Sequence, residues 1–157
     1  MAIGILLVGG FGTRLKPLTN QTPKPMLPVG GLPVTEHQLL AAKKAGITKV
    51  ILAASYLSEV FTPYFGDGSK WGMKLTYAAQ PSPDGLAQAL IIGEDFLDRA
   101  PSALVLGDNL FFGSAFSESI MVANARETGA TVFGYEVSNP SDYGVVGFDS
   151  NHKAVSL

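Results

Sequence analysis

Leu6-Leu7-Val8-Gly9-Gly10-Phe11-Gly12-Thr13-Arg14-Leu15, followed at residues 23–28 by Pro-Lys-Pro-Met-Leu-Pro, is the stretch that decides the fold. The apolar run at residues 3–8 predicts a buried strand, and closely spaced glycines end it. Glycine permits backbone angles that other residues avoid, and consecutive N–H groups in such a turn form an anion-binding concavity. Arg14 adds a planar cationic fork and Lys24 a compact ammonium, a pair suited to a polyphosphate. The alternative interpretation is a glycine-rich turn with two solvated basic residues.

Two other phosphate-binding glycine loops fit this sequence less well. A P-loop requires Gly-x4-Gly-Lys-Ser/Thr, and the sequence contains no such run. A dinucleotide fingerprint requires a third glycine where Leu15 stands. The second expected strand ends at Ser55 without an acidic residue for a ribose diol.

The remainder of the chain alternates strand and helix patterns, which predicts an α/β fold with a mostly parallel sheet in one domain over residues 1–157. The long loop at residues 9–33 is itself a sign of function. Ligands of such sheets bind at the carboxyl ends of the strands, so Gly9, Gln80 and Asp108 are expected to meet at one edge. The expected strands are 3–8, 49–54, 74–79, 103–106 and 130–137; the expected helices are 35–45, 58–65, 86–96 and 117–127; and 144–148 with 154–157 are expected to form a hairpin.

Three further segments offer polar or glycine groups to a ligand. Gln80 and Gly85 supply an amide and a glycine backbone, which can read a nucleobase edge or form an ordinary strand-to-helix turn. Asp108 follows a strand and either holds Mg²⁺, which prefers a few carboxylates with substrate phosphates, or caps a turn. Gly144 lies in the segment Tyr143-Gly144-Val145-Val146, which is otherwise a plain strand start.

The glycine loop together with the Pro-Lys-Pro segment resembles the signature of the sugar-1-phosphate nucleotidyltransferases. These enzymes join a nucleoside triphosphate to a sugar phosphate and release pyrophosphate. The resemblance implies a three-layer Rossmann-like fold of the nucleotidyltransferase type. Residues 1–79 resemble mannose-1-phosphate guanylyltransferases, whereas the residues from Gln80 onward resemble glucose-1-phosphate thymidylyltransferases, whose base-recognition segment residues 80–89 resemble. The sequence is therefore interpreted as a natural mosaic or a built chimera, with dTTP or GTP as its nucleotide.

The resemblance also implies a role for each motif residue. The reaction is an in-line attack by a hexose 1-phosphate on the α-phosphorus, with Arg14 on the β- and γ-phosphates and Lys24 at the α-phosphate. Asp108 is the implied Mg²⁺ ligand, and Gly144 lies near the sugar. The implied nucleotide-binding residues are Leu7, Gly9, Gly10, Gly12, Thr13, Gln80 and Gly85.

The family pattern is incomplete in this sequence. A Glu-Lys-Pro segment that grips the sugar and a second metal-binding Asp do not occur. The expectation is a truncated, nucleotide-binding half that is weak or inactive in turnover. A non-catalytic nucleotide-binding module and an engineered folding or assembly unit are the alternatives. An uncovered strand edge at residues 144–157 predicts a homodimer.

Composition limits the function classes. The chain has 157 residues, 46% of them apolar and 15% charged, which favours a buried globular core over disorder. The net charge of −2 gives no basic field for nucleic acid. Cysteine is absent, which excludes disulfides and a thiol nucleophile. No apolar run reaches membrane-spanning length and no signal peptide is recognised, so a cytoplasmic protein is expected.

Overall fold

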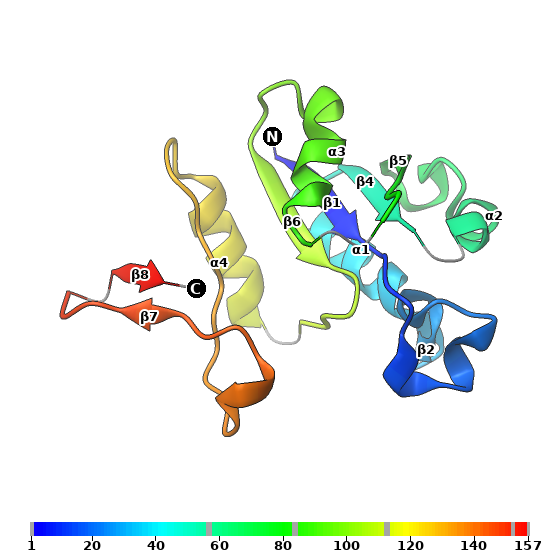
Figure 1. Ribbon diagram of the computed structural model, residues 1–157. Coiled ribbons are helices and arrows are strands. Elements are labelled where there is room, and N and C mark those ends of the chain that lie inside the picture. Colours follow the sequence, from blue (N-terminus) through cyan, green and yellow to red (C-terminus); the bar gives the residue numbers. More distant parts are fainter. Residues whose placement is uncertain (1, 56–57, 83–84, 112–113, 152, 157) are drawn as a thin grey trace. The chain divides into compact units, whose positions relative to one another are not determined.

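The computed structural model describes residues 2–55, 58–82, 85–111, 114–151 and 153–156. The chain forms two compact units, Met1–Ala125 and Arg126–Leu157 (Figure 1). The single domain expected over residues 1–157 stays a prediction. In the first unit the elements are β1 (Ile3–Leu7), β2 (Pro28–Val29), β3 (Leu32–Pro33), α1 (Val34–Lys44), β4 (Lys49–Ala54), α2 (Phe61–Phe65), β5 (Lys74–Ala79), α3 (Gln88–Leu97), β6 (Ser102–Leu106) and α4 (Ser114–Asn124).

A four-stranded sheet in the order β5-β4-β1-β6 is the centre of the first unit. All three strand pairs run parallel, and Leu6 of β1 lies between Leu52 of β4 and Val105 of β6. Parallel strands in register end at the same edge of a sheet. The predicted parallel α/β sheet is therefore confirmed.

Helices cover both faces of this sheet, which is why β1, β4 and β6 are apolar at successive positions, whereas the edge strand β5 alternates polar and apolar residues over its first four positions. On one face, Ile5 and Ile51 pack with Ala89 of α3, and all three side chains are almost fully buried. On the other face, α1 and α2 contribute to a larger core. Burying one such aliphatic or aromatic side chain stabilises the fold by about 1.5–3 kcal/mol. The larger core includes Leu6, Val8, Leu39, Leu52, Phe61 and Phe65.

The helices form where the sequence predicts them, with shifted ends. α1 ends before Gly46, which has a positive φ of 82° and donates its N–H to the Lys43 carbonyl oxygen at 2.9 Å. The segment at 58–65 divides into a 3-10 turn, Ser58–Val60, and α2. α3 begins at Gln88 instead of residue 86, and α4 spans Ser114–Asn124 where the pattern predicts 117–127.

The loop after β1 is more ordered than its composition suggests. It contains the short antiparallel pair β2–β3. Three 3-10 turns precede that pair; the first carries the end of the glycine-loop motif, and the third carries the centre of the Pro-Lys-Pro segment. These turns are Thr13–Leu15, Leu18–Asn20 and Lys24–Met26.

The second unit contains one hairpin, formed by β7 (Gly147–Phe148) and β8 (Ala154–Ser156), as expected. The strand predicted at residues 130–137 is wrong, because the structure describes these residues without strand pairing. A β-strand is stabilised by hydrogen bonds to a neighbour, and an apolar pattern alone does not provide one. Val132 and Tyr135 are accordingly 65% and 76% exposed.

Across the described ranges, no helix is long and apolar enough to cross a bilayer.

Candidate functional site

The carboxyl ends of the parallel strands come together, as the sequence predicts. The Gly107 N–H, just past β6, donates to the Leu7 carbonyl oxygen at the end of β1 at 2.7 Å. On the other side, the Gln80 N–H donates to the Ala54 carbonyl oxygen of β4 at 2.8 Å. The residues that follow all four strands therefore lie along one edge, where ligands of parallel sheets bind.

Gly9 is confined at this edge by two polar side chains. A Cβ at position 9 would lie 2.5 Å from Gln80 Oε1 and 2.9 Å from Ser55 Oγ. The Gly10 N–H in turn lies 3.4 Å from Ser55 Oγ, which accepts its hydrogen bond. In the sequence analysis, Ser55 only marks a strand end that lacks an acidic residue for a ribose diol. Ser55 nevertheless follows the end of a strand, which is the same feature that indicates Gly9 and Gln80 as site residues.

The conformation of the glycine loop is stabilised by residues that follow it in the chain. Gly12 has a positive φ of 57°, and its carbonyl oxygen accepts a 2.8 Å hydrogen bond from the fully buried Thr19 hydroxyl. A Cβ at Gly12 would lie 2.9 Å from Thr19 Cγ2 and 3.3 Å from Lys24 Cβ. The glycine thus lets the Pro-Lys-Pro segment pack directly against the loop.

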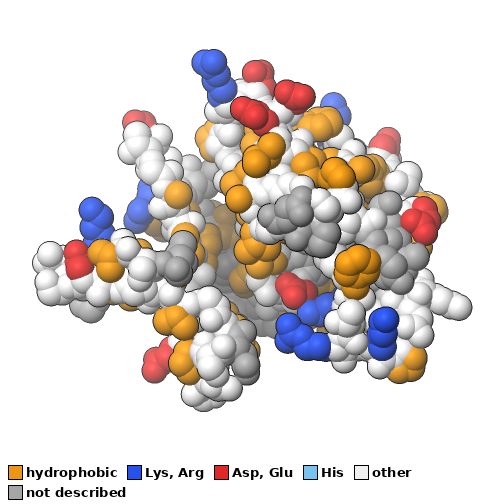
Figure 2. All heavy atoms as spheres, viewed as in Figure 1, with side chains coloured by type: hydrophobic (Ala, Val, Ile, Leu, Met, Phe, Trp, Pro, Cys, Tyr) orange, Lys and Arg blue, Asp and Glu red, His pale blue; other side chains and the backbone are white. Residues whose placement is uncertain are grey.

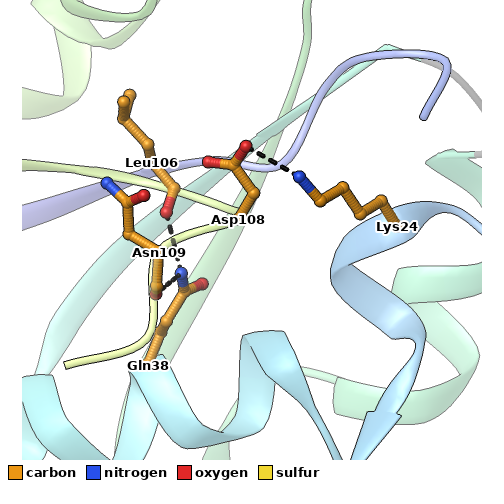
Figure 3. A network of polar contacts seen from close by, with 5 residues as sticks. All are labelled: Lys24, Gln38, Leu106, Asp108 and Asn109. Atoms are coloured by element: carbon orange, nitrogen blue, oxygen red, sulfur yellow. Dashed lines mark hydrogen bonds and ion pairs between the residues drawn. The ribbon is translucent and has the colours of Figure 1, made fainter. Parts of the chain in front are cut away.

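Lys24 and Asp108 form an ion pair at the centre of the site. The Lys24 ammonium donates to Asp108 Oδ2 at 3.0 Å, and Figure 3 shows the two side chains pointing toward one another. Their side chains are 40% and 49% exposed, so both groups are open to an incoming ligand. Figure 2 shows Lys and Arg side chains gathered beside a carboxylate on this side of the first unit, near β2.

Arg14 and Thr13 lie on the first 3-10 turn, and both are exposed. Among the described residues, the Arg14 guanidinium has no hydrogen-bond or ion-pair partner. Its five N–H donors therefore remain available for an anion such as a phosphate. The roles predicted for both residues stay predictions.

The Gln80 side chain is more buried than is expected of a side chain that contacts a nucleobase from the solvent side. It is 6% exposed, and its amide nitrogen donates to Gln88 Oε1 at 2.8 Å. Gly85 has a positive φ of 99°, and a Cβ there would meet no atom within 4 Å. Gly144 lies in the second unit before β7, and it is exposed. Base contact at Gln80 and Gly85, and sugar contact at Gly144, stay predictions.

The donor set around Asp108 fits a metal only in a particular way. The described part of the chain holds no group of three or more His, Cys, Asp or Glu side chains that could bind an ion together. Mg²⁺ commonly binds proteins through one or two carboxylates and completes its shell with water and substrate phosphates. The exposed Asp108 carboxylate suits that mode, in which the nucleotide supplies the other oxygens.

Comparison with known proteins identifies the family of the chain. A profile of the family described as "Nucleotidyl transferase" matches residues 3–157. A glucose-1-phosphate thymidylyltransferase of Xanthomonas campestris pv. campestris (strain B100) is 46% identical over 155 residues, covering 98% of this chain and 52% of that protein. A second glucose-1-phosphate thymidylyltransferase, from Neisseria gonorrhoeae, is 46% identical over 155 residues, and the match covers 54% of that protein. The chain spans about half the length of the curated relatives it matches. The separate likeness of residues 1–79 to guanylyltransferases stays a prediction.

Two solved structures share the fold. One, from Bacillus anthracis, is assigned as a glucose-1-phosphate thymidylyltransferase in complex with sucrose; its TM-score is 0.69 at 34% identity, over 78% of this chain and 51% of that one. A UDP-glucose pyrophosphorylase complexed with UDP-glucose has a TM-score of 0.68 at 22% identity, over 80% and 52% of the two chains, and this likeness concerns the fold alone. The profile and the relatives match nearly the whole sequence and the solved structures about four fifths of it, and the chain accordingly belongs to the nucleotidyl transferase family, among the sugar-1-phosphate nucleotidyltransferases.

Proposed function

We propose that this chain binds a nucleoside triphosphate together with Mg²⁺, as the nucleotide half of an enzyme that transfers a nucleotidyl group to a hexose 1-phosphate. The observation that carries the proposal is the Lys24–Asp108 pair, 3.0 Å apart at the sheet edge beside the glycine loop. A polyphosphate needs cations and N–H donors, and its metal needs a carboxylate. This edge provides all three.

Each group has a separate task in this proposal. The N–H groups of the loop at Gly9, Gly10 and Gly12 bind phosphate oxygens, and Arg14 holds the β- and γ-phosphates as pyrophosphate departs. Lys24 exchanges its bond to Asp108 for one to the α-phosphate. When bound, Mg²⁺ would neutralise charge on the phosphates, with Asp108 as its protein ligand. No protein nucleophile is required, so catalysis is by positioning and charge stabilisation.

We expect dTTP to bind more tightly than GTP. The relatives that align with both halves of the chain are named as thymidylyltransferases of glucose 1-phosphate. That naming supports dTTP as the nucleotide and glucose 1-phosphate as the hexose phosphate to test first.

The experiment is a calorimetric titration with dTTP and GTP, each in Mg²⁺ and in EDTA, combined with an assay of pyrophosphate release in glucose 1-phosphate. The proposal predicts dTTP binding that Mg²⁺ strengthens. Pyrophosphate release is expected to be slow, because the chain spans about half the length of its relatives. The absence of binding by either triphosphate at millimolar concentration would refute the proposal.

The same titration separates the alternatives. A non-catalytic nucleotide-binding module binds dTTP with Mg²⁺ and releases no pyrophosphate at any enzyme concentration. An engineered folding or assembly unit retains the fold and binds neither nucleotide.

A further inference from the structure

We propose that Thr35 and Gln38 are positioning residues, which hold Lys24 and Asp108 at their mutual distance from the buried face of α1. The inference rests on the proposed function, since it assigns a role in the same site. Neither residue hydrogen-bonds to the Lys24 or Asp108 side chain. Each acts on the backbone of a different segment that carries one member of the ion pair.

Gln38 holds the turn that carries Asp108. Its amide nitrogen donates to the Leu106 carbonyl oxygen at 2.8 Å and to the Asn109 carbonyl oxygen at 2.6 Å (Figure 3). These two acceptors flank Asp108 in sequence, so one amide group fixes both ends of its turn. Gln38 is only 6% exposed, and water therefore cannot easily replace it as the donor.

Thr35 holds the segment that carries Lys24. Its hydroxyl donates to the carbonyl oxygen of Pro25, the residue after Lys24, at 3.0 Å. Thr35 is fully buried. The Leu27 N–H closes the same 3-10 turn by donating to the Lys24 carbonyl oxygen at 3.1 Å. The backbone beneath Lys24 is therefore fastened to the first turn of α1.

Residues three positions apart lie on the same face of a helix. Thr35 and Gln38 have this spacing, and the helix between them has a fixed rise. The turns that carry Lys24 and Asp108 lie 84 residues apart in sequence, and both are thereby hydrogen-bonded to one rigid helix, α1. This common anchor holds the backbones of the two turns at a separation from which the Lys24 ammonium reaches the Asp108 carboxylate at 3.0 Å.

The polar group at position 38 also has a cost. Gln38 Oε1 is buried and has no hydrogen-bond partner in the described part of the chain. An unsatisfied buried acceptor lowers stability, whereas an apolar side chain would have no such atom. The position thus keeps an amide whose nitrogen holds the Asp108 turn, at the expense of an unpaired oxygen.

The test uses Gln38→Met and Thr35→Val, which keep the side-chain shapes and remove the donors. Glu36→Gln is the matched control on the same helix, because Glu36 accepts bonds from the Tyr64 hydroxyl and the Trp71 indole instead of holding the site turns. Thr35→Ser keeps the hydroxyl and is the conservative rescue. Two quantities are measured: amide hydrogen exchange at residues 107–109, and the ratio of dTTP affinity in Mg²⁺ to that in EDTA.

Gln38→Met is expected to speed amide exchange at residues 107–109 and to reduce the Mg²⁺-dependent gain in affinity at least about fivefold, the lower end of the range for its two lost hydrogen bonds. Its affinity in EDTA is expected to stay unchanged. Thr35→Val is expected to weaken dTTP binding in both solutions, because it acts on the lysine side, and Thr35→Ser to restore it. Glu36→Gln is expected to lower stability without changing the ratio.

Three results would overturn the inference. The first is a Gln38→Met variant with normal exchange and a normal ratio. The second is a Glu36→Gln control that lowers the ratio equally, which would identify a general stability effect. The third is a Thr35→Val variant that binds dTTP as the wild type does. A wild-type chain without any Mg²⁺-dependent gain would refute the proposed function and this inference with it, whereas a wild-type gain that Gln38→Met retains would refute the inference alone.

Discussion

Gly107→Ala is expected to open the junction between β1 and β6, where the site is assembled. A Cβ at position 107 would lie 2.6 Å from the Leu7 carbonyl oxygen and 2.9 Å from Val8 Cα. Real Cβ atoms do not approach other atoms this closely, and the obstructing atoms belong to backbone, which cannot rotate away. The carboxyl end of β6 must therefore move away from β1.

The structure gives the size of this effect. Inserting a methyl group into packed structure costs about 1–3 kcal/mol. The 2.7 Å hydrogen bond from the Gly107 N–H to the Leu7 carbonyl oxygen would also be stretched, at a cost of about 0.5–1.5 kcal/mol. We expect a total loss of about 2–4 kcal/mol in the free energy of unfolding.

Urea unfolding followed by tryptophan fluorescence measures this loss in the first unit, because Trp71 is the single tryptophan of the chain and is 9% exposed. The midpoint is expected to fall by about 1–2 M, for a typical denaturant slope of a small domain. Gly134→Ala is the matched control: a Cβ at that exposed glycine meets no atom within 4 Å, and its φ lies outside the strained positive range. A Gly107→Ala midpoint equal to that of the control would refute the close approach of the two strand ends.

Further predictions concern the phosphates, the metal, acid stability and association. Arg14→Ala is expected to weaken triphosphate binding by about 1.5–3 kcal/mol and monophosphate binding much less, by calorimetry; equal losses would remove Arg14 from the pyrophosphate role. Asp108→Asn is expected to abolish the Mg²⁺ dependence of nucleotide binding while costing at most about 1 kcal/mol of stability, since its ion pair is exposed; an unchanged metal dependence would contradict this. The pKa of Asp67 is lowered by hydrogen bonds from the Ser69 side chain and backbone. The contribution of Asp67 to stability is therefore complete above the unfolded pKa of 3.8 and is lost as pH falls through the lower folded value. Melting temperatures measured against pH should fall less steeply in this acidic range for Asp67→Asn than for the wild type. The chain is expected to form dimers by light scattering at tens of micromolar, through residues 144–157, which include the β7–β8 hairpin, and a dimer that survives deletion of that segment would exclude it as the interface.

Local sequence determined the sheet and the loop chemistry. β1, β4 and β6 form where apolar runs predict strands, because a parallel sheet covered on both faces needs apolar side chains at successive positions. β5 forms where the alternation of Leu75 and Tyr77 with polar residues predicts a strand. Their shared edge followed from topology alone, since parallel strands end on the same side. The motif at residues 9–15 indicated an anion site because glycine backbone and a neighbouring cation act locally.

Tertiary structure decided what lies across the chain. The pairing of Lys24 with Asp108 spans 84 positions, and no local pattern contains that distance. Gln38 reads as one polar residue in an amphipathic helix, and its role appears only when the helix lies beneath the Asp108 turn. The segment at 130–137 shows the opposite case: its apolar pattern predicts a strand, but these residues do not form one in the structure. Sequence periodicity specifies which side chains favour burial, whereas hydrogen bonding between distant segments depends on which backbones the completed fold brings within about 3 Å of each other.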